Sequence, residues 1–190
     1  MSREKGFSMI ELMFVCAILI IITVIAVPNI ARANANYKLD ASGHSVASLL
    51  QQARMQAVKT NQPAYVRYDN GTGMVYVTNA PGAAYVAGNP DVAVSKGLLF
   101  DPAPSPNHAQ LDTYAGGAGV WQISDNIGFN ARGLPCVGDV ANPALCASFP
   151  PRGFEWFMKN GNGGWEAVTV TPAGRVKSWR LTDTSAGTWQ

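Results

Sequence analysis

Side chains capable of catalysis are sparse in this 190-residue chain and poorly spaced for it. Residues 43–47 (Gly-His-Ser-Val-Ala) match part of a nucleophile elbow, but the second glycine and a preceding strand are missing. The two histidines, His44 and His108, lie far apart and have no partners at metal-ligand spacing. The glycine-rich residues 116–119 lack the lysine and the following serine or threonine of a phosphate-binding loop. We therefore predict no enzyme, no metal site and no cofactor.

A basic segment near the C-terminus could bind phosphates. Arg175, Lys177 and Arg180 are interleaved with Trp179, and on a strand positions 175, 177 and 179 share one face. Two cations and an indole on that face would suit DNA, since cations contact phosphates and an aromatic ring stacks on bases. The alternative, which the sequence favours, is that Trp179 belongs to the core and the cations lie on a solvated rim. The formal net charge of +2 is too small to indicate nucleic-acid binding by itself.

The cysteines differ by location. Cys136 and Cys146 flank a short loop, and no histidine lies nearby to support a zinc site. If this part of the chain is extracytoplasmic, a local disulfide is the leading interpretation, and it would stabilise the fold by roughly 2–3 kcal/mol. Cys16 lies in an apolar run and is most simply a small apolar residue.

The element that organises the chain is its N-terminal apolar run. Residues 12–27 carry no charge, and Thr23 is the only clearly polar residue among them. As a helix, residues 7–31 are long enough to cross a hydrocarbon core of roughly 30 Å. Glu11 lies near the start of the run, so its carboxylate needs either a partner or a position at the membrane interface.

A secretory signal peptide is the competing interpretation of this run. Arg3 and Lys5 supply the basic start of such a signal. Residues 28–33 (Pro-Asn-Ile-Ala-Arg-Ala) contain no convincing small-x-small cleavage site behind the apolar run. The small residue that stands out is Gly6, which lies before the run, so cleavage there leaves the hydrophobic helix on the mature protein.

Residues 6–12 (Gly-Phe-Ser-Met-Ile-Glu-Leu) closely resemble the prepilin leader of type IV pilins, with Ser-Met where that family usually has Thr-Leu. The resemblance implies that a prepilin peptidase cuts after the glycine and methylates the new N-terminal Phe7. It also implies that Glu11 pairs with the new α-amino group of a neighbouring subunit in a filament, so that two charges in an apolar bundle neutralise each other. Pro28 resembles the proline at which many pilin helices bend or melt, and it favours a pilus over a secretion pseudopilus.

A second helical pattern follows the span. Apolar residues recur at three- and four-residue spacing over residues 46–58, which predicts a helix packed on a sheet. Residues 40–42 could cap or interrupt this helix around Gly43, with Ser45 near a helix start, and residues 61–63 end it. Residues 50–63 resemble the helix end of the GspH/FimT group of minor pilins and pseudopilins.

Strands dominate the rest of the chain. Glycine (19 residues) and proline (12 residues) are plentiful, so we expect long loops over residues 79–119, with one short strand near 98–100. Residues 69–73 carry a hairpin signal. Two segments, 128–133 and 168–176, again resemble the GspH/FimT group. The predicted strands are residues 64–68, 74–78, 120–124, 127–130, 154–159, 165–171 and 175–181.

The sequence thus predicts an α+β, pilin-like fold: a long N-terminal helix, its first half transmembrane, packed on a β-rich antiparallel head. The expected parts are a leader (1–6), a transmembrane assembly helix (7–31), the amphipathic second half of the helix (32–62) and the head (63–190). The resemblance implies a minor pilin or pseudopilin that helps initiate or cap a type IV pilus or a type II secretion pseudopilus. A DNA-binding minor pilin acting in DNA uptake is the alternative.

The same resemblance implies the partners and the location. We expect other pilins or pseudopilins, the prepilin peptidase and the bacterial inner membrane as partners, with DNA as a further one under the alternative. The few basic residues before the span favour a cytoplasmic N-terminus and a periplasmic head. An assembled filament would carry the protein to the cell surface.

Overall fold

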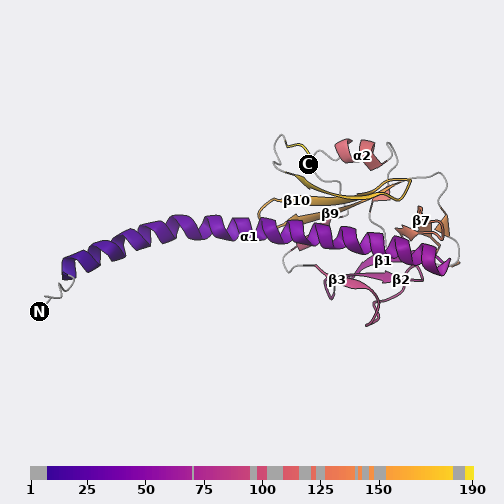
Figure 1. Ribbon diagram of the computed structural model, residues 1–190, viewed down its shortest axis with the longest axis horizontal. Helices are drawn as coiled ribbons and strands as arrows, with labels where there is room; N and C mark the ends of the chain where they lie inside the picture. Colours follow the sequence, from indigo (N-terminus) through magenta and orange to yellow (C-terminus); the bar gives the residue numbers. More distant parts are fainter. Residues whose placement is uncertain are drawn as a thin grey trace, which may run out of the picture.

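A single long helix dominates the molecule (Figure 1). The computed structural model describes residues 8–69, 71–94, 98–101, 109–115, 121–122, 127–139, 141–142, 146–147, 153–181 and 187–190. Helix α1 (Met9–Thr60) has 52 residues. Its N-terminal half projects from the head, and its C-terminal half lies along the head.

Helix α1 ends where the sequence predicts. Asn61 adopts the left-handed conformation (φ 54°), and its N–H points back to the carbonyls of Ala57 and Val58. Asparagine tolerates this conformation, which satisfies carbonyls that the end of a helix leaves without partners. Pro63 then follows as the residue before the first strand.

The expected interruption of the helix at Gly43 is wrong. Helix α1 runs through this residue without a break, and the Ser45 hydroxyl donates to the Ala41 carbonyl inside the helix (2.8 Å) instead of marking a helix start. A Cβ atom added at Gly43 would lie 2.5 Å from Cγ of Glu166. Glycine is therefore present because the helix approaches a strand closely there, not because the helix stops.

The head contains two sheets, and α1 contacts strands of both. In the six-stranded sheet the order is β3-β2-β1-β6-β7-β8, and all neighbours are antiparallel. The predicted hairpin at residues 69–73 joins its first two strands. These six strands are β1 (Ala64–Asp69), β2 (Met74–Thr78), β3 (Asp91–Ala93), β6 (Ile127–Phe129), β7 (Pro135–Gly138) and β8 (Cys146–Ala147).

The five-stranded sheet has the order β11-β10-β9-β4, with β5 added parallel to β9. Its other pairs are antiparallel, as predicted for the head. The predicted bounds of the last three strands hold to within one residue. The five strands are β4 (Leu98–Asp101), β5 (Trp121–Gln122), β9 (Phe154–Asn160), β10 (Trp165–Val170) and β11 (Val176–Leu181).

The prediction of long loops with one short strand over residues 79–119 is incomplete. This region also contributes β3 and the short helix α2 (Ala109–Ala115). The segment between the two cysteines, expected to be a loop, begins and ends in the paired strands β7 and β8. These elements have two to seven residues, which is too short for periodicity to show in the sequence.

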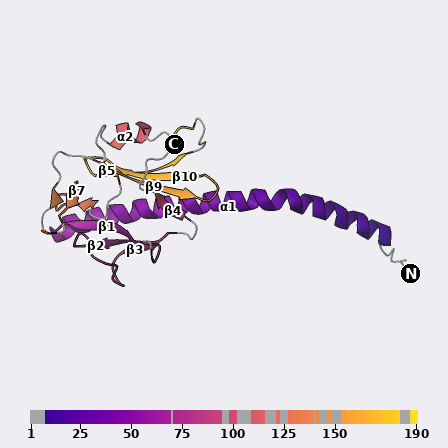
Figure 2. The ribbon, with the colours of Figure 1, turned by 180° about the vertical axis from the view of Figure 1, so that it is seen from behind.

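Two apolar clusters hold the layers together. The larger one lies between α1 and the two sheets and includes Leu50, Phe129 and Trp156, each at most 1% exposed. The smaller one lies on the other face of the five-stranded sheet, beneath α2, and includes Leu111, Phe157 and Trp179. Figures 1 and 2 show the five-stranded sheet between the two helices.

Candidate functional site

The projecting half of α1 is the first candidate site. All residues from 8 to 25 are exposed, although nearly all of them are apolar. Within the described part of the chain, α1 is the one helix that is long and apolar enough to cross a membrane. A large exposed apolar surface indicates a membrane or a protein partner, because contact between apolar side chains and water is unfavourable.

Polar side chains inside this half find partners on the helix itself. The Thr23 hydroxyl donates to the Leu19 carbonyl (3.0 Å), and the Asn29 amide donates to the Ile25 carbonyl (3.0 Å). Such bonds remove the cost of placing these groups in hydrocarbon. Helix α1 continues through Pro28, and Figure 1 shows it curving over its projecting half.

The predicted assembly residue lies at the tip of this half. Glu11 is exposed in the first turn of α1. A carboxylate near a helix N-terminus interacts favourably with the helix dipole. The predicted cleavage and methylation positions, Gly6 and Phe7, lie outside the described residues.

At the other end of α1, Arg54 joins three motifs that are distant in sequence. Its Nε donates to the Gly133 carbonyl (3.0 Å), and its Nη2 donates to the Ala173 carbonyl (3.2 Å). The motif at the helix end thus contacts both head segments that carry the GspH/FimT resemblance. Hydrogen bonds from a guanidinium are stronger than neutral ones, so Arg54 fastens the helix end to two turns.

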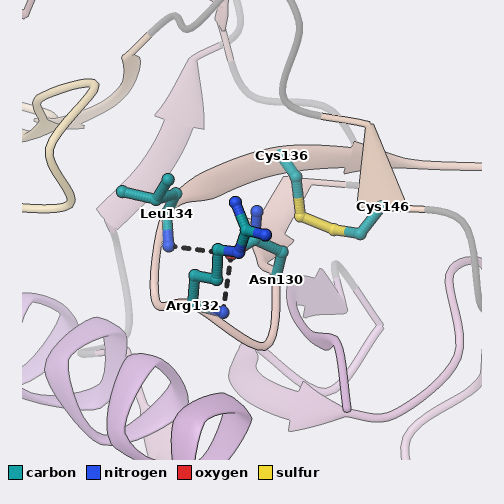
Figure 3. Close-up of a disulfide and its surroundings, with 5 residues drawn as sticks. All are labelled: Asn130, Arg132, Leu134, Cys136 and Cys146. Carbon is teal, nitrogen blue, oxygen red and sulfur yellow. Dashed lines mark hydrogen bonds between the residues drawn. A yellow bond between two sulfur atoms is a disulfide. The ribbon is translucent and has the colours of Figure 1, made fainter. Parts of the chain in front are cut away.

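The two turns need glycine where they meet. Gly133 and Gly174 have positive φ angles of 73° and 78°. A Cβ on Gly174 would lie 2.4 Å from the carbonyl oxygen of Gly133. In the first turn the Asn130 side chain accepts hydrogen bonds from the backbone N–H groups of Arg132 (2.9 Å) and Leu134 (3.1 Å), as Figure 3 shows.

The predicted disulfide lies beside this first turn (Figure 3). Cys136 on β7 and Cys146 on β8 are bonded, with their Cα atoms 5.3 Å apart. Cys136 is fully buried. The bond closes the edge of the six-stranded sheet, where β8 pairs with β7 through two residues only.

The basic segment near the C-terminus supports the core interpretation of Trp179. This indole is 8% exposed, and its Nε1 donates to the Thr169 hydroxyl (2.8 Å). The Tyr114 ring packs against it edge-on with centroids 4.7 Å apart, and Lys177 Nζ lies 3.4 Å from its centroid. Arg175 is exposed. The aromatic face that DNA bases would stack on is therefore occupied by groups of the protein.

Two family models match the sequence. The model described as type II transport protein GspH matches residues 42–187, and the prokaryotic N-terminal methylation motif matches residues 1–27. The chain belongs to the GspH family. It is a minor pilin or pseudopilin of a type IV pilus or of type II secretion, a structural subunit that assembles with other pilin subunits. The methylation motif and the apolar helix together indicate membrane anchoring.

Solved structures similar to this GspH-family chain have low identity. The type IV minor pilin FimU of Pseudomonas aeruginosa matches in two crystal forms, with 13% and 16% identity and TM-scores of 0.47 and 0.46. These matches cover 79% and 80% of this chain and 97% and 93% of FimU. The minor pseudopilin EpsH of Vibrio cholerae has 12% identity and a TM-score of 0.43, covering 74% of this chain and 95% of EpsH. No curated protein matches the sequence significantly.

Two buried carboxyl groups in the head of this family member escaped sequence analysis. Glu155 and Glu166 are at most 1% exposed. Burial, with the nearby charge of Asp112, raises the pKa of Glu155 to about 8. Burial and the charge of Asp40 raise the pKa of Glu166 to about 9, against the opposing effect of Arg180. Both glutamates are therefore mostly protonated at neutral pH. In the sequence, the one sign of their burial is that their neighbours in β9 and β10 are mostly apolar.

His44, on the head-facing half of α1, lies between a carboxylate and a hydroxyl group. His44 Nε2 lies 3.8 Å from the Asp40 carboxylate, and its Nδ1 lies 3.2 Å from the Ser178 hydroxyl. His108 lies outside the described residues, as do residues 116–119. No group of three or more potential metal ligands is found in the part of the chain that the structure describes.

Proposed function

We propose that this chain is a low-abundance filament subunit that helps initiate or cap a type IV pilus or a type II secretion pseudopilus. The observation that carries the proposal is the division of α1: its first half is apolar and exposed, while its second half belongs to the core of the head. A subunit built this way can place the first half in a membrane and later among the helices of neighbouring subunits.

The proposed processing follows from the methylation motif. A prepilin peptidase removes residues 1–6, and Phe7 becomes the methylated N-terminus. Residues 7–31 remain as the span in the inner membrane, with residues 32–62 and the head at 63–190 in the periplasm until assembly carries them outward. The disulfide between Cys136 and Cys146 supports this orientation, because disulfides persist in oxidising compartments.

Glu11 is the proposed assembly contact. A charge left unpaired in an apolar helix bundle costs at least ~2.5 kcal/mol on the most lenient scale. The α-amino group of a neighbouring Phe7 would offset this cost by pairing with the carboxylate. Pro28, within the same span, is the proposed site at which the helix adapts to its neighbours, since the residue removes one backbone donor.

We also propose that the role is structural and not catalytic. The DNA-binding alternative is the weaker candidate, because Tyr114 and Lys177 already cover the Trp179 ring. Arg175, Lys177 and Arg180 remain able to contact phosphates, so this alternative is testable by DNA binding alone.

Replacing Glu11 by Ala tests the proposal. Removing a charge makes the span more apolar, so the variant should remain in the membrane fraction at the wild-type level. It should be depleted in pulldowns with other pilins, because the pairing with a neighbour's amine is lost. Thr23→Ala is the matched control: it removes a polar group from the same span without changing charge and should assemble normally. Normal assembly of Glu11→Ala would refute the pairing.

A further inference from the structure

A groove of about 510 Å³ lies where α1 leaves the head. Arg32 and Asn36 line it from the helix, and Trp165 and Arg180 line it from the five-stranded sheet. Figures 1 and 2 both show the β9–β10 hairpin meeting α1 at the end of the head from which the helix projects. The groove thus lies at the end of the head from which the apolar half of α1 projects.

The wall of the groove is fixed before any ligand arrives. Asn160, at the end of β9, donates from Nδ2 to the Asn36 side-chain oxygen (2.9 Å) and accepts the backbone N–H of Gly164 on its own oxygen (2.8 Å). A Cβ on Gly164 would lie 3.0 Å from the Asn36 oxygen. The hairpin turn is therefore fastened to the helix at close range, which lowers the entropic cost of binding a ligand between them.

Two arginine side chains line the groove. Arg32 and Arg180 are both exposed, and no acidic side chain is among the described residues that line the groove. Neither arginine forms a salt bridge within the described residues. The carboxyl group opposite Arg180 on β10 belongs to Glu166, which is mostly protonated at neutral pH. Within the described residues, both guanidinium groups thus lack a carboxylate at salt-bridge distance.

The position of the groove along α1 indicates which anion is near. Arg32 is the first charged residue after the apolar run, and Asn36 lies about 6 Å further along the helix. The headgroup layer adds roughly 5–8 Å to each side of the hydrocarbon core. If the apolar run fills the core, the groove lies at the depth of the lipid phosphates. The half-buried Trp165 fits this depth, because tryptophan is enriched at membrane interfaces.

We propose that this groove binds the phosphate of an anionic membrane phospholipid, with Arg32 and Arg180 on either side of the phosphate and Trp165 beside the glycerol backbone. A guanidinium matches phosphate oxygens with two parallel hydrogen bonds. The bound lipid holds the head against the membrane surface before the subunit enters a filament. This inference rests on the proposed placement of the span in the membrane.

The test uses the full chain in mixed micelles of a nonionic detergent with either phosphatidylglycerol or phosphatidylcholine, and native mass spectrometry counts the retained lipids. Phosphatidylglycerol should be retained in preference to phosphatidylcholine. Each arginine replaced by glutamine should weaken retention about fivefold, the size of one cation's attraction to an anionic surface. The double variant Arg32→Gln, Arg180→Gln should therefore lose roughly 25-fold.

The matched control is the double variant Lys59→Gln, Arg132→Gln, which removes the same charge from exposed side chains at the far end of the head. Lys59 lies about 40 Å from Arg32 along α1. This control should retain phosphatidylglycerol at the wild-type level. The single variant Arg32→Gln carries the test by itself if Arg180→Gln disturbs β11, because Arg32 lies outside the sheets.

Three outcomes would overturn the inference. Equal retention by the wild type and the Arg32→Gln variant would show that the arginine does not hold the lipid. Displacement by millimolar inorganic phosphate would indicate a general anion site. Unchanged lipid retention with lost filament incorporation would assign the arginines to a neighbouring subunit. Failure of the proposed filament role is separable, because Glu11→Ala should still retain phosphatidylglycerol.

Discussion

The two halves of α1 share one continuous helix and differ in what surrounds them. In the first half, the side chains of Ile20 and Ile25 are each 62% exposed. In the second half, Leu39, Leu50 and Ala57 are at most 2% exposed. The backbone is helical in both, so the difference shows that the sequence specifies the partners of each half and not only its secondary structure.

The distribution of apolar residues explains this difference. The first half is apolar on every side, which suits a helix surrounded by lipid or by other helices. The second half is apolar on one side only, and the opposite side carries charged and amide side chains. Its buried residues follow three- and four-residue spacing: Leu39, Ser42, Gly43, Val46, Ala47, Leu49, Leu50, Ala53 and Ala57.

The largest expected change in the free energy of unfolding comes from a substitution in the second half of α1, compared with a matched substitution in the first half. Leu50→Ala removes a fully buried side chain between α1 and the sheets and should lower the free energy of unfolding by about 2–5 kcal/mol. Ile20→Ala removes a similar volume from the exposed half and should leave the unfolding of the head unchanged. Denaturant unfolding of both full-length variants in detergent, followed by tryptophan fluorescence, measures this. Equal losses of unfolding free energy in the two variants would contradict the assignment of only the second half of α1 to the core of the head.

The next largest change concerns the pH dependence of stability, which we attribute to Glu166, buried beneath the second half of α1. Its pKa is raised from 4.5 to about 9 in the folded state. Between these values the unfolded chain releases a proton that the folded chain keeps, so wild-type stability should fall as pH rises through this window. Glu166→Gln cannot ionise and should be more stable than the wild type by roughly 1–3 kcal/mol at pH 8. The two proteins should differ little at pH 4.

A stability that is flat from pH 5 to pH 9 in the wild type would contradict this assignment. So would a Glu166→Gln variant that is less stable at pH 8. In both cases the carboxylate would have to be ionised in the folded head and held by a partner such as Arg180.

Sequence patterns predicted the parts of the fold that rest on local signals. The helix end at Asn61, the hairpin at residues 69–73 and the closing strands all carry turn residues or long periodic runs, and the structure contains them. Gly43 misled the prediction because a glycine needed for close packing looks the same in sequence as a glycine that ends a helix. Helix α2 lies in a region rich in glycine and proline, where its seven residues leave no clear period.

The candidate sites were predictable to a different extent. The Cys136–Cys146 bond was predicted from the short loop between the two cysteines together with an extracytoplasmic location, and the structure contains it. The meeting of Arg54 with two distant turns could not be derived from one sequence, because the contacts span 79 and 119 residues. The burial of Glu166 depends on the same kind of long-range approach, between β10 and Gly43.

A smaller change in the free energy of unfolding is expected when the hydrogen bonds of Arg54, near the C-terminal end of α1, are removed. Arg54→Met keeps the length of the side chain but loses the hydrogen bonds to the Gly133 and Ala173 carbonyls. We expect a loss of about 1.5–2 kcal/mol in the free energy of unfolding. Lys59→Met, an exposed change one turn further along the helix, should cost less than ~0.5 kcal/mol. Similar losses for both variants would argue against the role of Arg54.

The smallest expected change in the free energy of unfolding concerns the basic side chains in and just before β11, a strand that packs against the second half of α1. Replacing Arg175 and Lys177 by Gln should change the free energy of unfolding by no more than ~1 kcal/mol, the size of an exposed cation–π contact. The full chain should show no DNA binding at physiological salt in a filter-retention assay, with or without these changes. Binding that weakens steeply with salt, and less steeply in the variant, would restore the DNA-uptake alternative.

The central claim is that the apolar half of α1 stays on the mature protein and serves assembly. Mass spectrometry of the protein extracted from membranes tests this most directly, by measuring where the mature chain begins. The account predicts an N-terminus at Phe7 carrying one methyl group, so that the whole of residues 7–31 is retained. A mature chain that begins at Met1, or at a residue beyond Ala31, would contradict it.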